Sequence, residues 1–249
     1  MSMNDQTIPI SSGHLHPLTL TIRHIVGAIA PLGFEVILGP EKETEYYNFD
    51  ALNVPKNHPA RDMQDTFWIK GVTETVLRTH TSAVQARHME YNHPPFRILV
   101  PGKVFRHEAT DATHEAQFYQ VEGLAVDKNI SLADLKGTLL FFLKDFFGED
   151  ITMRLRPSFF PFVEPGAEID IGCFKCSGKG CGVCKQTGWI EILGAGMVHP
   201  NVLNIHKIDP RKWRGFAFGL SVDRLIMLKY GVPDIRLLYS GDLRVVNQF

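Results

Sequence analysis

The sequence has no excess of charge of either sign, because 26 lysines and arginines stand against 27 aspartates and glutamates in 249 residues. A formal net charge of −1 supplies no overall field that would attract a polyanion such as RNA. Any nucleic acid must therefore be held by a local basic patch or by a partner.

The sequence also lacks a hydrophobic run long enough to cross a bilayer and a recognisable signal peptide. Its most apolar stretch, LLFFLKDFF, is short and is interrupted by Lys144 and Asp145. The first residues are polar, with no basic start followed by an apolar segment, so we expect residues 1–15 to be a flexible N-terminus. These absences predict a soluble, cytoplasmic protein with no membrane partner.

Cysteine is scarce, and all four cysteines fall in one stretch, CFKCSGKGCGVC. Cys173, Cys176, Cys181 and Cys184 form two pairs on either side of a glycine-rich turn that can fold one pair onto the other. Four thiolates in a closed site are the ligands that structural zinc prefers. Bound iron, four free thiols and two disulfides are the alternatives, of which disulfides are disfavoured in a cytoplasmic chain. We expect a metal that staples a protruding loop, distant from any catalytic centre.

No internal repeat, low-complexity segment or flexible linker divides the sequence, so we expect one large domain. Apolar residues at three- and four-residue spacing predict a first helix, which Pro31 and Gly33 end. A second helix is predicted from the capping box of Ser131 and Asp134 to Gly148. Short β-rich runs outnumber the helices and several are joined by short turns. The fold class predicted is α+β, with a mainly antiparallel sheet flanked by helices.

The stretch VFRHEATDATHEAQFYQVEGLAV resembles a hairpin but carries charged and amide side chains on both predicted strands. Gln120 and Glu122 share one face because the strand period is two, and the same holds for Arg106 and Glu108. This pattern indicates either a ligand lying across the sheet or a solvated face with cross-strand ion pairs. Arg224, in GLSVDR, adds another cation at a predicted turn from strand to helix and favours the ligand.

Long segments resemble the alpha subunits of bacterial phenylalanyl-tRNA synthetases, a family of class II aminoacyl-tRNA synthetases. They include HPLTLTIR, YYNFDALNVPKNHPARDMQDTFW, LRTHTSAVQ, RPSFFPFVEPGAE, GAGMVHPNVL and LKYGVPDIRLLYSGDLR. FRHE and GLSVDR resemble class II motifs 2 and 3, and GFEVILGP with the preceding helix resembles motif 1. The resemblance implies an antiparallel sheet of six or seven strands flanked by helices. It also implies a catalytic domain over residues 16–249 with a zinc-binding insertion at 173–184.

The resemblance implies ATP-dependent activation of L-phenylalanine to phenylalanyl-adenylate, with Mg²⁺ as a cofactor. Together with a beta subunit, in an alpha2beta2 assembly, such a protein transfers the amino acid to the terminal adenosine of tRNA(Phe). By this resemblance Arg106 contacts the α-phosphate and the substrate carboxylate, Glu108 binds the adenine amino group, and Arg224 binds the γ-phosphate. Glu164 and Glu191 are candidate magnesium ligands.

The same resemblance implies a pocket for phenylalanine. Gln120 and Glu122 would hold its α-amino group. Phe160 and Phe162, expected on one strand face, would meet its ring edge to face. Considered singly, an aromatic residue is more often part of a core, and a histidine such as His80 is more often structural. The implied substrate-binding residues are Trp68, His80, Ser82, Gln120, Glu122, Phe160, Phe162 and Ala217.

The sequence departs from the family in two places. In motif 3, Ser221 stands where a second glycine is usual and Asp223 where glutamate is usual. The loop after motif 2 differs at Glu115 and Ala116. No segment corresponds to the family's N-terminal helical arm, which reaches tRNA.

Two expectations about assembly and two alternative function classes follow. We expect an isolated chain to form a homodimer through motif 1 and the helix that bears Ile22, Ile25 and Ile29, and to need a beta subunit for tRNA charging. One alternative is a paralogue that adenylates an amino acid for a non-tRNA acceptor. The other is a non-catalytic regulatory subunit, which would be expected to lose Arg106 or Arg224.

Overall fold

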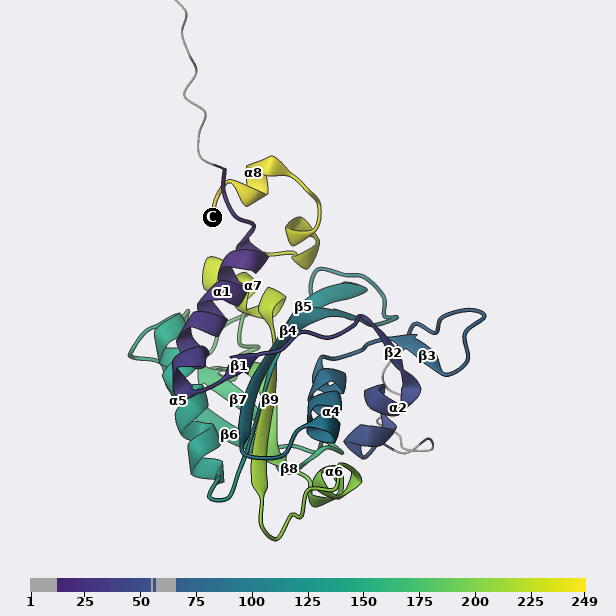
Figure 1. Cartoon of the computed structure of the whole chain (residues 1–249). Helices are drawn as coiled ribbons and strands as arrows, with labels where there is room; N and C mark the ends of the chain where they lie inside the picture. Colours follow the sequence, from purple (N-terminus) through teal and green to yellow (C-terminus); the bar gives the residue numbers. More distant parts are fainter. Residues whose placement is uncertain (1–12, 55, 57–65) are drawn as a thin grey trace, which may run out of the picture.

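The computed structural model describes residues 13–54, 56 and 66–249, so most of the N-terminus predicted to be flexible lies outside the described residues. A seven-stranded sheet crosses the molecule in the order β1-β4-β5-β9-β8-β7-β6 (Figure 1). β1 runs parallel to β4, and the other neighbouring pairs of this sheet are antiparallel. The predicted sheet is confirmed. Its strands are β1 (Glu35–Val36), β4 (Phe96–Phe105), β5 (Gln117–Asp127), β6 (Met153–Pro157), β7 (Val163–Gly172), β8 (Trp189–Val198) and β9 (Arg214–Ser221).

Helices cover both faces of this sheet (Figure 1). On one face α1 packs against α5 and α7; on the other lie α2, α4, α6 and a small sheet of β2 and β3. None of the helices in the described ranges is long and apolar enough to cross a membrane. The remaining elements are α1 (Pro17–Ile29), η1 (Ala30–Leu32), β2 (Lys42–Thr44), α2 (Glu45–Asn48), η2 (Asp50–Leu52), β3 (Thr75–Leu77), α4 (Ser82–Tyr91), α5 (Leu132–Phe147), α6 (Pro200–Ile205), α7 (Val222–Tyr230), η3 (Ile235–Leu238) and α8 (Leu243–Val246).

The central strand β5 divides its side chains between two cores. Val121 packs into the core beneath α1 and α5, whereas Leu124 and Val126 belong to the core on the α4 side. Because alternate residues of a strand point to the same face, Gln120 and Glu122 also face the α4 side. The polar positions of β5 therefore lie on the face that α4 covers.

Both predicted helices are present. α1 runs into the 3-10 turn η1 and stops at Gly33, whose φ of 87° is in the left-handed region that glycine adopts without strain. α5 begins at Ser131, whose backbone N–H donates to Asp134 Oδ2 at 2.9 Å, and it ends at Gly148. The capping box is thus confirmed.

The apolar face of α1 is buried within its own chain. Ile25 and Ile29 are completely buried in the core, and Ile22 packs against it. The expectation that these side chains form an exposed subunit interface is therefore wrong. The large apolar side chain that the helix does leave exposed is Leu20.

Candidate active site

A cavity of about 250 Å³ lies on the α4 side of the sheet. Its walls come from α4, β5, β8, β9 and the segment before β7. Trp68 lies elsewhere, 54% exposed and bridged to Val76 of β3. The other seven residues expected to bind the substrate line the cavity together: His80, Ser82, Gln120, Glu122, Phe160, Phe162 and Ala217.

The polar end of this cavity is built around the carboxylate of Glu122, which is 5% exposed. It accepts hydrogen bonds from Thr81 N at 3.2 Å, from Ser82 Oγ at 2.6 Å and from Gln85 Nε2 at 3.0 Å. Burial raises the pKa of Glu122 to about 7 even though these donors favour the charged form. A cationic ligand group would compensate the buried charge.

Two buried polar atoms of the residues that line this cavity have no hydrogen-bond partner among the described residues. They are His80 Nδ1 and Gln120 Oε1, both buried in side chains that line the cavity. Burial, helped by the charge of Arg106, lowers the pKa of His80 to about 3, so its ring is neutral. Buried polar atoms are nearly always hydrogen-bonded, so these two atoms indicate that a polar ligand group completes the site.

The apolar end is closed by aromatic and small side chains. The rings of Phe160 and Phe162 are nearly parallel, with centroids 5.9 Å apart and an interplanar angle of 23°. They lie between β6 and β7, where Phe160 bridges to Val163, so the expectation that they share a strand face is wrong. Ala217 pairs across the sheet with Leu124, and Phe162 and Ala217 pack against the same apolar cluster.

A second cavity, of about 880 Å³, shares the side chain of Glu191 with the first. Arg106, Glu108 and Arg224, the three residues expected to bind ATP, line it together. Arg106 Nε donates to Thr79 O at 3.3 Å, and its guanidinium carbon lies 5.0 Å from the centroid of the Phe118 ring. Arg106 and Arg224, which share this cavity, come from segments more than a hundred residues apart in the chain.

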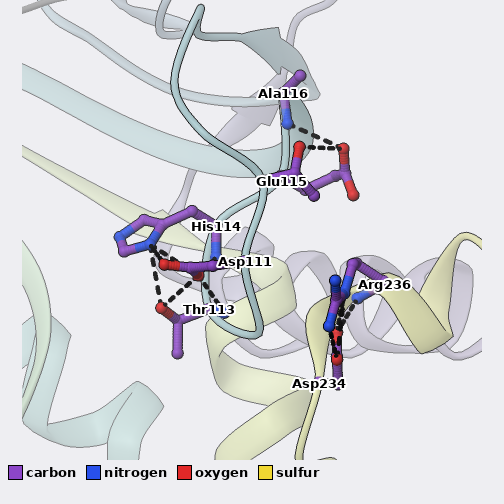
Figure 2. Close-up of polar contacts among 8 residues, drawn as sticks. Asp111, Thr113, His114, Glu115, Ala116, Asp234 and Arg236 are labelled. Atoms are coloured by element: carbon purple, nitrogen blue, oxygen red, sulfur yellow. Dashed lines mark hydrogen bonds and ion pairs between the residues drawn. The ribbon is translucent and has the colours of Figure 1, made fainter.

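Arg106 and Glu108 lie just beyond the end of β4, so the prediction that they occupy strand positions is wrong. They begin a loop that Asp111 organises (Figure 2). Asp111 Oδ1 accepts hydrogen bonds from the backbone N–H groups of Thr113 and His114 at 2.6 and 2.8 Å, which hold the pKa of the carboxyl well below its usual range. The loop thus has a defined turn of its own.

The same loop is attached to the C-terminal part of the chain. Ala112 O accepts a hydrogen bond from Ile235 N, at the start of η3, at 2.9 Å. Glu115 Oε1 accepts from Ala116 N at 3.0 Å, so the two residues at which the sequence departs from its family interact with each other (Figure 2). His114 and Glu115 line the second cavity from this loop.

The two candidate magnesium ligands are not brought together. Glu191 lines both cavities and lies 3.4 Å from the guanidinium of Arg156, while burial raises its pKa. The side chain of Glu164 is 74% exposed and pairs with His199 at 3.1 Å. Of the two candidates, only Glu191 therefore lines the second cavity.

The four cysteine sulfurs form a compact cluster in which all lie within 4.8 Å of one another. The Cys173–Cys181, Cys176–Cys184 and Cys181–Cys184 sulfur distances are each 3.8 Å. The edge of a tetrahedron with zinc–sulfur bonds of about 2.3 Å is about 3.8 Å, whereas a disulfide measures about 2.05 Å. The donor set and its spacing fit a tetrahedral metal ion, and all four cysteines are free.

Backbone N–H groups point at the sulfurs. Gly180 N donates to Cys176 Sγ at 3.2 Å, and Cys181 N and Gly188 N donate to Cys184 Sγ at 3.1 and 3.3 Å. Burial by itself raises the pKa of the Cys184 thiol, but these donors bring it down to about 6. The loop therefore stabilises thiolates, the form in which cysteine binds metals.

A family model described as the tRNA synthetases class II core domain (F) matches residues 2–249. The chain belongs to this family. Phenylalanine–tRNA ligase alpha subunits of Bacillus cytotoxicus and Bacillus mycoides are each 58% identical to this synthetase chain over 243 residues, or 97% of its length and 70% of theirs. The crystal structure of pyrrolysyl-tRNA synthetase from Desulfitobacterium hafniense superposes with a TM-score of 0.66 over 91% of this chain and 74% of that one. At 16% identity, that likeness shows the fold alone.

Both departures in motif 3 of this synthetase have structural roles. Ser221 is the N-cap of α7 and accepts a hydrogen bond from Arg224 N at 3.2 Å. Asp223 is completely buried and accepts from Tyr119 N at 2.8 Å and from Tyr239 Oη at 2.5 Å. Asp223 therefore ties β5 to the segment after α7 instead of reaching into a cavity.

Sequence reasoning missed some site residues of this synthetase. Gln85 lies three residues after Ser82 on α4, and helical spacing places both on one side, but the helix itself was not predicted. Phe118 lies between Gln117 and Tyr119 on β5, without any distinguishing pattern. Arg78 lines neither cavity, but its buried charge partly opposes the effect of burial that raises the pKa of Glu122; its hydrogen bonds to Gly39 O and Pro40 O, at 3.0 and 3.2 Å, have no signal in the neighbouring sequence.

Proposed function

We propose that this chain activates L-phenylalanine with ATP to phenylalanyl-adenylate and, with a beta subunit in an alpha2beta2 assembly, transfers it to the terminal adenosine of tRNA(Phe). The observation that carries the proposal is the pair of cavities that share Glu191 in their walls. One is small, with a buried carboxylate at its polar end and aromatic walls. The other is larger and lined by arginines. The 58% identical relatives named phenylalanine–tRNA ligase alpha subunits support the choice of amino acid and tRNA, and a cytoplasmic enzyme.

The first cavity orients the amino acid. The α-ammonium group binds Glu122 and the unpaired Oε1 of Gln120. Donors on α4 hold the Glu122 carboxylate in place before the ligand arrives, so little reorganisation is needed. The aromatic ring extends toward Phe160, Phe162 and Ala217, and the substrate carboxylate lies toward the polar end, where the charge of Arg106 acts on Glu122 and His80.

The second cavity stabilises the charge that develops when the carboxylate attacks the α-phosphate. The Arg106 guanidinium contacts the α-phosphate, Arg224 contacts the γ-phosphate, and Glu108 accepts a hydrogen bond from the adenine amino group. A planar guanidinium suits these tasks because it presents paired donors in fixed geometry to phosphate oxygens. Magnesium entering with ATP would neutralise phosphate charge, and Glu191 would hold it.

The four cysteines bind one structural zinc ion. Replacing both Cys176 and Cys181 by serine should abolish zinc binding and lower the melting temperature, because metal binding contributes directly to the stability of such a loop. Elemental analysis of protein purified without chelators checks the first effect and calorimetry the second. Lys175→Ala, a change in the same loop, should retain one zinc per chain. Purified protein that contains iron, or no metal, would contradict the zinc assignment.

Tyrosine should be a poor substrate. The apolar end of the cavity offers Phe160, Phe162 and Ala217 to a para-hydroxyl, and burying a hydroxyl without a partner costs roughly 1–3 kcal/mol, or about 5- to 150-fold in kcat/KM. Ala217→Gly should widen this end and admit para-substituted rings. Amino-acid-dependent exchange of labelled pyrophosphate into ATP measures both effects, and equal rates with tyrosine and phenylalanine in the unmodified protein would exclude the assignment.

The same exchange assay tests the proposed function against its alternatives. We expect slow phenylalanine-dependent exchange by the isolated chain, and tRNA charging when the beta subunit is added. A regulatory subunit would show no exchange, although Arg106 and Arg224 share a cavity here. A paralogue would exchange but leave tRNA(Phe) uncharged in the complete assembly, and the relatives do not favour it. Sedimentation of the isolated chain tests the homodimer expected from the sequence, for which the buried side chains of Ile25 and Ile29 supply no interface.

A further inference from the structure

The cysteine loop forms one wall of the large cavity. Val183, Cys184, Lys185 and Thr187 line the same space as the arginines of motifs 2 and 3. The expectation that this loop is distant from the catalytic centre is therefore wrong. Side chains of this loop instead face the cavity in which we propose that ATP binds.

The cluster determines where Lys185 lies. Lys185 and Gln186 have φ values of 49° and 66°, so two successive non-glycine residues adopt the left-handed conformation. Such a conformation is unfavourable unless surrounding contacts impose it. Those contacts come from the cysteine loop, because Gln186 N donates to Cys181 O at 2.9 Å and Thr187 Oγ1 to Cys184 O at 2.6 Å.

Lys185 is an exposed cation that no carboxylate pairs with in the part of the chain that the structure describes. Other cations of this cavity are neutralised: Arg154 pairs with Asp170 at 2.9 Å, and Arg156 pairs with Glu168. Arg224, the expected γ-phosphate ligand, likewise forms no ion pair within the described residues. An unpaired lysine on the wall of an arginine-lined cavity attracts an anion of several charges.

We infer that Lys185 binds the triphosphate of ATP, and that the cysteine cluster sets the affinity for ATP by holding Lys185 in position. The inference rests on the proposed function, since it assumes that the large cavity takes a nucleoside triphosphate. It adds a phosphate contact from an element outside the class II motifs. It also makes ATP binding depend on the integrity of the four-thiolate site.

A reciprocal effect follows from thermodynamic linkage. If an intact cluster strengthens ATP binding by some factor, then bound ATP must strengthen retention of the metal by the same factor. ATP should therefore slow the release of zinc to a chromogenic chelator. With Lys185→Ala this protection should be lost, because the residue that connects the two sites is gone.

The test uses the full chain with its beta subunit, and calorimetry measures the Kd values of ATP and of phenylalanine separately. Lys185→Ala should raise the Kd of ATP about tenfold, the scale of one charge-assisted contact, without changing zinc content. Chelator-treated protein should show a similar rise. Lys179→Ala, on the same loop but outside the cavity lining, is the matched control and should bind ATP normally. The Kd of phenylalanine should stay constant throughout, because its cavity does not include the loop.

The outcomes separate the two proposals. If the unmodified assembly binds neither ATP nor phenylalanine, the proposed function fails. If it binds both, an ATP Kd that is unchanged by Lys185→Ala overturns the inference alone. An equal weakening of ATP and phenylalanine binding also overturns it, since that result would report general destabilisation.

Discussion

Arg106→Ala should lower the rate of phenylalanine-dependent pyrophosphate exchange by about 10²- to 10³-fold, the usual effect of removing one preorganised donor from a developing oxyanion. Arg106 lines the large cavity, and its Nε donates a hydrogen bond to Thr79 O. This bond holds the side chain in place before any ligand binds. Because the guanidinium is buried, water solvates its charge poorly, which lowers its pKa. A poorly solvated cation interacts strongly with a phosphate. Arg106→Lys should recover only part of the loss, because an ammonium cannot provide the paired donors.

Arg97→Ala is the matched control for this prediction. Arg97 is on the same strand, β4, but its side chain donates to Leu32 O at 3.0 Å, away from the cavities. Both variants should fold with similar melting temperatures, whereas their exchange rates should differ by orders of magnitude. An Arg106→Ala enzyme that exchanges at the wild-type rate would show that this residue does not contact the reacting phosphate.

Glu122→Gln should weaken phenylalanine binding by at least about thirtyfold, since removing one member of a buried charged pair costs roughly 2–5 kcal/mol. The variant keeps the shape of the side chain, so the loss reports the charge. Equilibrium dialysis with labelled phenylalanine measures it. Glu90→Gln is the matched control. It alters a carboxylate on the exposed side of α4 that accepts a hydrogen bond from Tyr47, and it should bind phenylalanine normally.

The same residue makes binding depend on pH. Burial raises the pKa of Glu122 from 4.5 to about 7, so in the free protein the carboxyl is largely protonated below pH 7. Because an ammonium binds the carboxylate and not the acid, the Kd of phenylalanine should rise about tenfold for each pH unit below 7. The contribution of this group to stability has the opposite trend: it is present below pH 4.5 and is lost as the pH rises through 7. A Kd of phenylalanine that does not change between pH 5.5 and 8 would contradict the predicted pH dependence of binding.

Features that depend on neighbours along the chain were predictable. The capping box of Ser131 and Asp134 and the stop at Gly33 follow from backbone conformations within one helical turn. The shared face of Gln120 and Glu122 follows from the period of a strand. The cysteine spacing likewise predicted a compact cluster, and the sulfurs lie within 4.8 Å of one another.

Helix α4 shows why other features were not predictable. Its Ser82 and Gln85 point toward Glu122, while Val84 and Ala86 pack into two different apolar clusters. A helix that is buried on several sides by both polar and apolar partners has no single apolar face to detect. The sequence carried no sign of it beyond the resemblance to a family.

By itself the sequence determined the fold class, the cap and turn positions, the cysteine cluster and the residue types of the site, because these depend on local spacing or on a shared family pattern. The tertiary structure decided which of these residues meet. It placed Trp68 outside the first cavity and Glu164 outside the second, buried Asp223 against Tyr119, and brought Lys185 into the space lined by Arg106. Contacts between distant segments result from the packing of whole elements on the two faces of one sheet, and spacing along a chain does not carry that information.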